Sequence, residues 1–240
     1  MIWYGFEKID FTFEGYEATV VLPEKKADNA TLILKTEYWD AFPETEIELL
    51  KRGHFLGYIK NKNRWGTDDD IDRKSRFVKH ITKEYMLPEK CVLVGMSCGG
   101  LSAIKFSAKH PEDVACIYID APVLNYMSCP CGFGVGERTD DESFTEILTA
   151  LDMSSISELI CYRDTTQHNI PLLIKNKIPV ILVSGDSDTI VPYVENGILI
   201  EKAYKQNDLP IDIFIKPGCN HHPHGLDNPT PIVKCILKYV

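Results

Sequence analysis

Three groups of residues have the types and spacing that suit acyl transfer, and the first is Gly-Met-Ser-Cys-Gly at 95–99. This pentapeptide follows an apolar run, Cys91–Val94, and precedes the helix-forming segment 101–106. A serine in such a strand-to-helix turn takes strained backbone angles, and small residues two positions to either side let neighbouring chains pass. The turn lifts the hydroxyl off the sheet edge above the start of a helix. Ser97 is therefore the predicted nucleophile.

The second group holds two aspartates that follow the predicted buried strand Pro179–Val183. Aspartates placed shortly before a proline commonly form Asx turns or cap a helix, and Pro192 follows here. Because there are two aspartates, one can form such a turn while the other serves as the catalytic acid. We predict that Asp188 is the catalytic acid and that Asp186 organises the turn.

The third group is a histidine cluster, His221, His222 and His224, just after the predicted last strand, Ile211–Ile215. Serine, aspartate and histidine each follow a strand end, in an order found in serine hydrolases. A metal site is the competing interpretation. However, Pro223 stiffens the loop and no carboxylate stands at a familiar ligand spacing, so we predict no metal and no cofactor.

These three motifs, within Gly95–Gly99, Gly185–Pro192 and Gly218–His222, resemble those of α/β-hydrolase-fold serine hydrolases. The nearest likeness is to compact bacterial esterases and to the prolyl-oligopeptidase-type catalytic domain. In this family the base usually comes soon after a glycine that ends the last strand, which favours His221 over the other two histidines. Some members take the acid from the strand after the nucleophile helix, so Asp120 is kept as the alternative acid.

The resemblance also implies an oxyanion hole with two backbone N–H donors. One is expected from Cys98, the residue after the nucleophile. The other is expected from the loop after the strand Thr31–Lys35, where the family's His-Gly is absent from this sequence. By position Glu37 is the first candidate and Tyr38 the second.

Aromatic residues in the loops are candidate pocket walls. Tyr38, Trp39, Trp65 and Phe133 fall in loops expected near the nucleophile. Such residues are often packing anchors instead. If any contacts substrate, Trp39 or Trp65 is the first choice.

The sequence predicts antiparallel strands in its first part, followed by alternating strands and helices that position these residues. A hairpin turn at Glu14-Gly15 joins two alternating strands, and continuous β-branched runs further on are typical of parallel strands buried on both faces. The alternation lapses at about 122–178. We predict one α/β-hydrolase domain over 1–240, with a mostly parallel sheet, helices on both faces and a small cap insert at 122–178. Its expected segments are strands at 9–13, 16–22, 31–35, 54–60, 91–94, 114–119, 179–183 and 211–215, and helices at 45–52, 71–85, 101–109, 144–151, 156–161, 192–206 and 230–239.

Composition narrows the class of protein. The formal net charge of −9 disfavours nucleic acid or an anionic membrane as partner, and no apolar run approaches the ~20 residues that span a bilayer. No secretory signal is visible, so the eight cysteines, Cys161 among them, are expected to be mostly reduced core thiols in a cytoplasmic protein. Cys129-Pro130-Cys131 lacks a partner pair at zinc-finger spacing. Oligomeric state is not indicated.

The predicted activity is hydrolysis of a small-molecule carboxylic ester, with a small or carbohydrate-linked acyl group, through an acyl-serine intermediate. A prolyl-oligopeptidase-type serine peptidase is the alternative within the class, although no propeller-like segment or acidic pair for a free amino terminus is evident. An alternative of another class is a non-catalytic binding protein with the same fold. The presence of serine, aspartate and histidine together argues against it.

Overall fold

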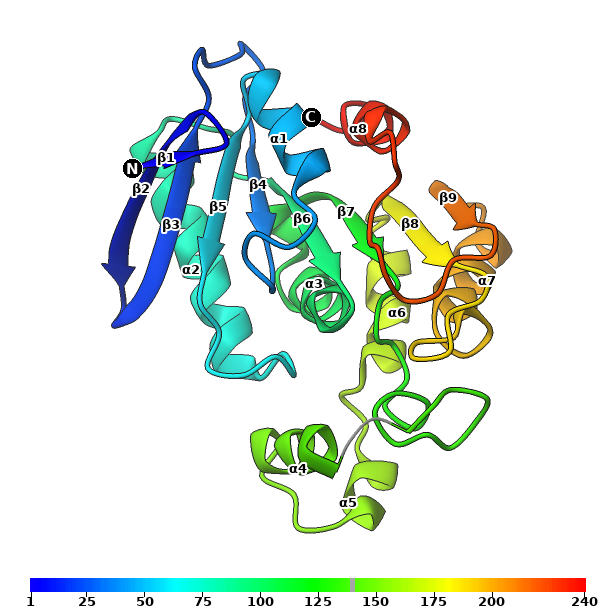
Figure 1. Cartoon of the computed structure of the whole chain (residues 1–240). Helices are drawn as coiled ribbons and strands as arrows, with labels where there is room; N and C mark the ends of the chain where they lie inside the picture. Colours follow the sequence, from blue (N-terminus) through cyan, green and yellow to red (C-terminus); the bar gives the residue numbers. More distant parts are fainter. Residues whose placement is uncertain (139–140) are drawn as a thin grey trace.

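The computed structural model describes residues 1–138 and 141–240, and the strands of this part form one nine-stranded sheet (Figure 1). The sheet order is β1-β2-β3-β5-β4-β6-β7-β8-β9. Pairing is antiparallel from β1 through β3 to β5 and parallel from β5 to β9, which confirms the predicted mixed sheet. The strands are β1 (Ile2–Trp3), β2 (Phe6–Phe13), β3 (Tyr16–Leu22), β4 (Leu32–Lys35), β5 (Phe55–Ile59), β6 (Cys91–Met96), β7 (Val114–Asp120), β8 (Val180–Gly185) and β9 (Ile211–Lys216).

The hairpin between β2 and β3 turns at the predicted residues. Glu14 and Gly15 both have positive φ, 49° and 84°. Two consecutive residues of this kind match the right-handed twist of the flanking strands.

Side chains of the central strands alternate between two apolar cores, one on each face of the sheet. In β6, Leu93 enters one core while Val92 and Val94 enter the other. Because both faces are covered, such strands read as continuous apolar runs. Helices α2 (Asp68–Glu84), α3 (Cys98–Lys109), α6 (Thr166–Lys175) and α7 (Gly197–Gln206) cover one face, and α1 (Glu44–Lys51) and α8 (Thr230–Ile236) cover the other (Figure 1).

The segment after β7 departs from the alternation, as expected, but over a shorter range than 122–178. Helices α4 (Asp141–Ala150) and α5 (Ile156–Cys161) stand away from the sheet, beyond the carboxyl ends of its strands (Figure 1). Helix α6 instead buries Ile170 and Leu173 in the core of the sheet. Its apolar face makes it one of the covering helices, so the excursion ends near residue 165.

The helix predicted over 192–206 is also interrupted. A 3-10 turn at Tyr193–Glu195 is followed by Asn196, and only then does α7 begin. The carboxamide oxygen of Asn196 accepts the backbone N–H groups of Leu124 and Asn125, each at 3.0 Å. This tie fastens the segment after β7 to the segment after β8.

No helix in the described ranges is both long enough and apolar enough to cross a membrane. The eight cysteines are free thiols. Most are buried, but Cys161 is exposed at the end of α5, so the expectation that it lies in a core was wrong.

Candidate active site

Ser97 lies at the tight turn between β6 and α3, with φ 51° and ψ −119°. A Cβ added to Gly95 would lie 2.3 Å from the carbonyl oxygen of Gly99, so the turn closes only without a side chain there. The neighbouring strand β7 supports the turn, because the Ser97 N–H donates to the Asp120 carbonyl oxygen at 2.9 Å. The strain expected of a nucleophile turn is therefore present at the predicted residue.

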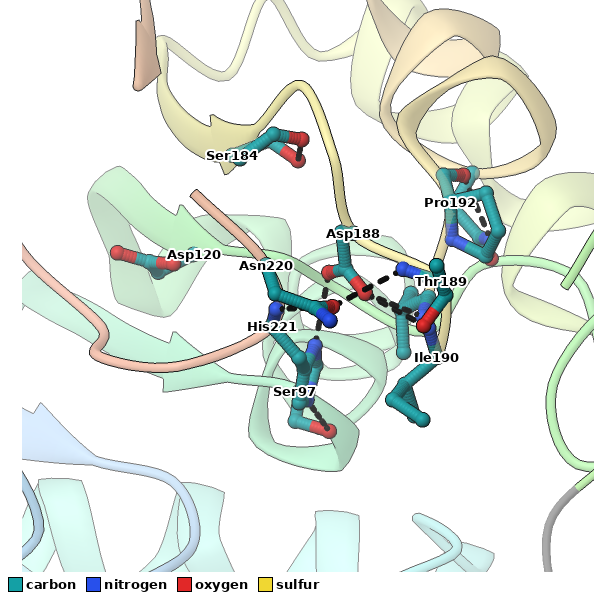
Figure 2. Close-up of polar contacts among 12 residues, drawn as sticks. Ser97, Asp120, Ser184, Asp188, Thr189, Ile190, Pro192, Asn220 and His221 are labelled. Atoms are coloured by element: carbon teal, nitrogen blue, oxygen red, sulfur yellow. Dashed lines mark hydrogen bonds and ion pairs between the residues drawn. The ribbon is translucent and has the colours of Figure 1, made fainter. Parts of the chain in front are cut away.

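The structure brings Ser97, His221 and Asp188 into one hydrogen-bonded chain (Figure 2). His221 Nε2 lies 3.2 Å from Ser97 Oγ, and His221 Nδ1 lies 2.8 Å from Asp188 Oδ2. His221 and Asp188 are 7% and 6% exposed, so their contact is largely shielded from water.

The loops after β8 and β9 are tied together at this point. Asn220 Oδ1 accepts the N–H of Thr189 at 3.0 Å and that of His221 at 2.7 Å (Figure 2). Gly185 permits the crossing, since a Cβ there would lie 2.2 Å from the Cys219 carbonyl oxygen. The histidine loop therefore passes directly over the end of β8.

Asp188 both holds the histidine and organises its own turn. Its Oδ1 accepts the N–H groups of Ile190 at 2.9 Å and Val191 at 2.8 Å. Burial raises the pKa of Asp188, but the hydrogen bonds from His221 and these two N–H groups outweigh burial and lower it below the ordinary value. Asp186 accepts the N–H of Gly218 at 2.7 Å and so also ties the two loops.

A second buried carboxylate–histidine pair stands beside the first. His224 Nδ1 lies 2.9 Å from Asp120 Oδ1, and Asp120 Oδ2 accepts the N–H of Gly225 at 2.6 Å. Asp120 is fully buried and points away from the His221–Ser97 contact (Figure 2). The alternative acid is thus paired with another histidine.

His222 is the exposed member of the cluster, stacked on Phe42 with ring centroids 5.7 Å apart. Burial and the two neighbouring imidazoles lower its pKa. The sequence indicates His222 and His224 as members of the histidine cluster and Asp120 as the alternative acid, but it predicts neither the pairing of Asp120 with His224 nor a role for Phe42. The signal that could have found the pair was the position of Asp120 at the end of β7 and of His224 in the loop after β9, because only β8 separates these two strands in the sheet.

A pocket of about 380 Å³ opens in front of Ser97. The described residues that line it include no carboxylate, and Arg64 is its one permanently charged side chain. They are Tyr38, Ala41, Phe42, Arg64, Met96, Ser97, His221, His222 and His224.

Of the predicted pocket aromatics only Tyr38 lines this pocket. Trp39 packs against Trp3 and Tyr58, with centroids 5.3 and 5.4 Å away, on the opposite side of the loop. Trp65 is 2% exposed and packs edge-on to Tyr126. Neither tryptophan therefore lines the pocket in front of Ser97, where they were expected from the sequence as the first-choice substrate contacts. Phe133 is exposed and does not line the pocket either.

The two segments that carry the expected oxyanion donors pack against each other. Cys98 is the first residue of α3, where a backbone N–H has no acceptor within its own helix. A Cβ built on Gly99 would lie 3.5 Å from the Glu37 backbone nitrogen, so the loop after β4 abuts the start of α3. The Tyr38 N–H is engaged by the Glu37 carboxylate at 3.3 Å, which leaves Glu37 as the better candidate of the two. The Cys98 thiol is buried and its pKa is raised, so it is not a competing nucleophile.

A buried ion pair also supports the loop after β4. Lys35 Nζ lies 2.6 Å from Glu46 Oε1 and donates to the Ala41 carbonyl oxygen at 2.9 Å. Both ionic side chains are 2% exposed. The ion pair therefore anchors the segment that contains Tyr38 and Phe42 from beneath.

The sequence of this chain matches a model of a known protein family. The model of the prolyl oligopeptidase family matches residues 58–235. Similar solved structures include Porphyromonas gingivalis dipeptidyl peptidase 4, with a TM-score of 0.67 and 14% identity over 98% of this chain and 36% of that one. The chain thus spans little more than a third of that peptidase.

Two other similar structures match along nearly their whole length. Est1E from Butyrivibrio proteoclasticus has a TM-score of 0.65 and 15% identity, with 97% of this chain and 96% of that chain covered. TT1662 from Thermus thermophilus has a TM-score of 0.66 and 14% identity, with 98% of each chain covered. At such identities the likeness is one of fold.

Proposed function

Because the chain belongs to the prolyl oligopeptidase family, we propose that this serine hydrolase cleaves carboxylic esters of small or carbohydrate-linked acyl groups. The observation that carries the proposal is His221 standing between Ser97 Oγ and Asp188 Oδ2. A serine hydroxyl is almost un-ionised at neutral pH, and an imidazole with a pKa of ~6.5 is suited to accept its proton.

In the proposed mechanism Ser97 Oγ attacks the ester carbonyl carbon while His221 Nε2 takes the hydroxyl proton. Asp188, ionised because its pKa is lowered, accepts the Nδ1–H bond and stabilises the imidazolium. The oxygen that becomes anionic is bound by the N–H groups of Cys98 and Glu37. His221 returns the proton to the leaving alkoxide, the alcohol departs, and water then cleaves the acyl-serine by the same steps.

Two observations favour an ester over a peptide substrate. The small pocket has no carboxylate among its described lining residues, so it offers no counter-charge to a free amino terminus. The likeness to an esterase, Est1E, also extends over both whole chains. The peptidase alternative keeps the support of the family match, and substrate assays decide between the two.

Labelling by a fluorophosphonate, followed by mass spectrometry of the labelled peptide, tests the nucleophile. We expect labelling of wild type and of Ser187→Ala, which removes a nearby exposed hydroxyl, and none of Ser97→Ala. An unlabelled wild-type protein would favour the non-catalytic alternative. Equal ester hydrolysis by Ser97→Ala would refute the mechanism.

Turnover of p-nitrophenyl acetate and a panel of acylated sugars, set against aminoacyl and dipeptidyl p-nitroanilides, tests the substrate class. We expect kcat/KM for the best ester to exceed that for the best anilide by at least tenfold. The opposite ratio would replace the esterase proposal by the peptidase one.

A further inference from the structure

Three imidazole rings converge beside Ser97, although the proposed proton transfer needs only one. The ring centroids of His221, His222 and His224 are 4.9 to 5.0 Å apart in every pair. One ring nitrogen from each lies within 4.8 Å of the other two, and all three rings line the same pocket. Such a cluster offers a set of nitrogen ligands.

Two of these rings are held by buried carboxylates at Nδ1. His221 is held by Asp188 at 2.8 Å and His224 by Asp120 at 2.9 Å. A proton kept at Nδ1 by a carboxylate leaves the lone pair on Nε2. This carboxylate–histidine arrangement is the one that orients histidine ligands in metal sites.

The Asp120–His224 pair has no task in the proposed hydrolysis. Asp120 lies at the end of β7, fully buried, and is fixed by the Gly225 N–H and by the Tyr118 hydroxyl, which lies 3.3 Å away. Two carboxylate-oriented histidines on one loop are more than the triad requires. A ligand shared by both histidines accounts for the second pair.

Against the sequence-based prediction of no metal, we propose that His221, His222 and His224 together bind one divalent transition-metal ion of the Zn²⁺ class. Three neutral imidazoles without a carboxylate or thiolate ligand suit Zn²⁺, Cu²⁺ or Ni²⁺ and not the hard ions Mg²⁺ and Ca²⁺. Tetrahedral bonds of about 2.0–2.1 Å put ligand nitrogens roughly 3.4 Å apart, so the rings close in on the ion. His222 is the exposed ring and is held by no carboxylate of the described residues, so it is the ring that moves toward the ion.

The bound ion inhibits the hydrolase. It occupies the Nε2 lone pair of His221, the atom that takes the Ser97 proton in the proposed mechanism. Phe42, edge-on to His224 at 5.3 Å and stacked on His222, forms an apolar wall on one side of the site. The inhibition rests on the proposed function, whereas the binding of the ion does not.

Calorimetric titration of the metal-stripped full chain with Zn²⁺ tests the site. We expect one equivalent bound by wild type, at least tenfold weaker binding by His222→Gln and by His224→Gln, and no binding of Mg²⁺. Asp120→Asn is expected to weaken Zn²⁺ binding about 10–100-fold, an effect that an unsupported surface cluster would not show. The matched control is His110→Gln, which alters the other described metal-ligand grouping, His110 with Glu112 and Asp113, and leaves the affinity unchanged.

Hydrolysis of p-nitrophenyl acetate gives the second readout, with each variant compared to its own metal-free rate. We expect Zn²⁺ to inhibit wild type, EDTA to restore activity, and the inhibitory concentration to rise at least tenfold in His222→Gln. Absence of stoichiometric binding, or binding that neither His222→Gln nor His224→Gln alters, would overturn the site. Zn²⁺ binding by a protein that hydrolyses no ester would support the site while refuting the proposed function.

Discussion

Replacing Asp188 by asparagine tests the acid–base pair with almost no change in side-chain shape. Asp188 Oδ1 accepts two backbone N–H groups, from Ile190 and Val191, at 2.9 and 2.8 Å. Oδ2 accepts from His221 Nδ1 at 2.8 Å. The asparagine carbonyl must take the Oδ1 position, because the opposite orientation would set an amide NH₂ against two N–H donors. The NH₂ group then faces His221 Nδ1.

The magnitude follows from the tautomer that this orientation imposes. An Nδ1 atom facing an NH₂ donor must be the acceptor, so the imidazole proton moves to Nε2, which can no longer take the Ser97 proton. Recovering the useful tautomer by turning the amide leaves two buried donors unsatisfied, at about 1–3 kcal/mol each. Lost stabilisation of the imidazolium adds to this cost. We expect kcat to fall by about 10⁴, equivalent to about 5.5 kcal/mol.

Asp120→Asn is the matched control, because Asp120 is also buried and also binds a histidine Nδ1, but not that of His221. The assay is kcat and KM for p-nitrophenyl acetate in metal-free buffer, with thermal unfolding to verify that both variants fold. We expect Asp120→Asn to stay within about tenfold of wild type. A larger loss from Asp120→Asn than from Asp188→Asn would refute the assignment and move the acid to β7.

Two other predictions concern residues that support the site, and a third concerns the segment at 135–136. Gly95→Ala should lower the free energy of unfolding by about 3 kcal/mol and abolish fluorophosphonate labelling, because its Cβ meets a backbone carbonyl oxygen at 2.3 Å; an unchanged urea midpoint would contradict this. Lys35→Met should cost about 3–5 kcal/mol in urea unfolding by leaving the Glu46 carboxylate buried and unpaired, and the double variant with Glu46→Leu should recover most of the loss. Burial raises the pKa of Glu195, but hydrogen bonds from a serine hydroxyl and the 135–136 N–H groups lower it overall, below 4.5. Amide exchange protection at 135–136 should therefore hold above pH 4.5 and vanish as the pH falls through the lowered pKa, whereas pH-independent protection would contradict it.

Prediction of the central strands from sequence succeeded because each carries its own signal. Apolar β-branched runs at 114–119 and 179–183 became β7 and β8 with ends one or two residues away. The strand predicted at 91–94 extends as β6 through Gly95 and Met96, because these two residues continue the hydrogen-bonded pairing with β7. The apolar run that predicts the strand ends before them. Local composition therefore predicts which segments are strands better than it predicts where they end.

The aromatic loop residues could not be placed in the same way. Tyr38, Asp40 and Phe42 all have positive φ, between 49° and 70°, in the loop after β4. Each such residue reverses the local direction of the chain. Trp39 is thereby turned toward Trp3 and away from the pocket that its neighbour Tyr38 lines. Propensity gives no indication of three positive-φ residues that are not glycine, so the side of the loop on which a residue falls was not predictable.

The pairing of two aspartates with the histidine loop has a topological cause. In the sheet β9 lies beside β8, and β8 lies beside β7. A chain that leaves β9 and returns across the sheet edge must pass the end of β8 before the end of β7. His221, the earlier residue, therefore meets Asp188 after β8, and His224 meets Asp120 at the end of β7. Residue chemistry alone left both acids and all three histidines open, whereas the strand order of a parallel sheet assigns each histidine to its acid from its position in the loop.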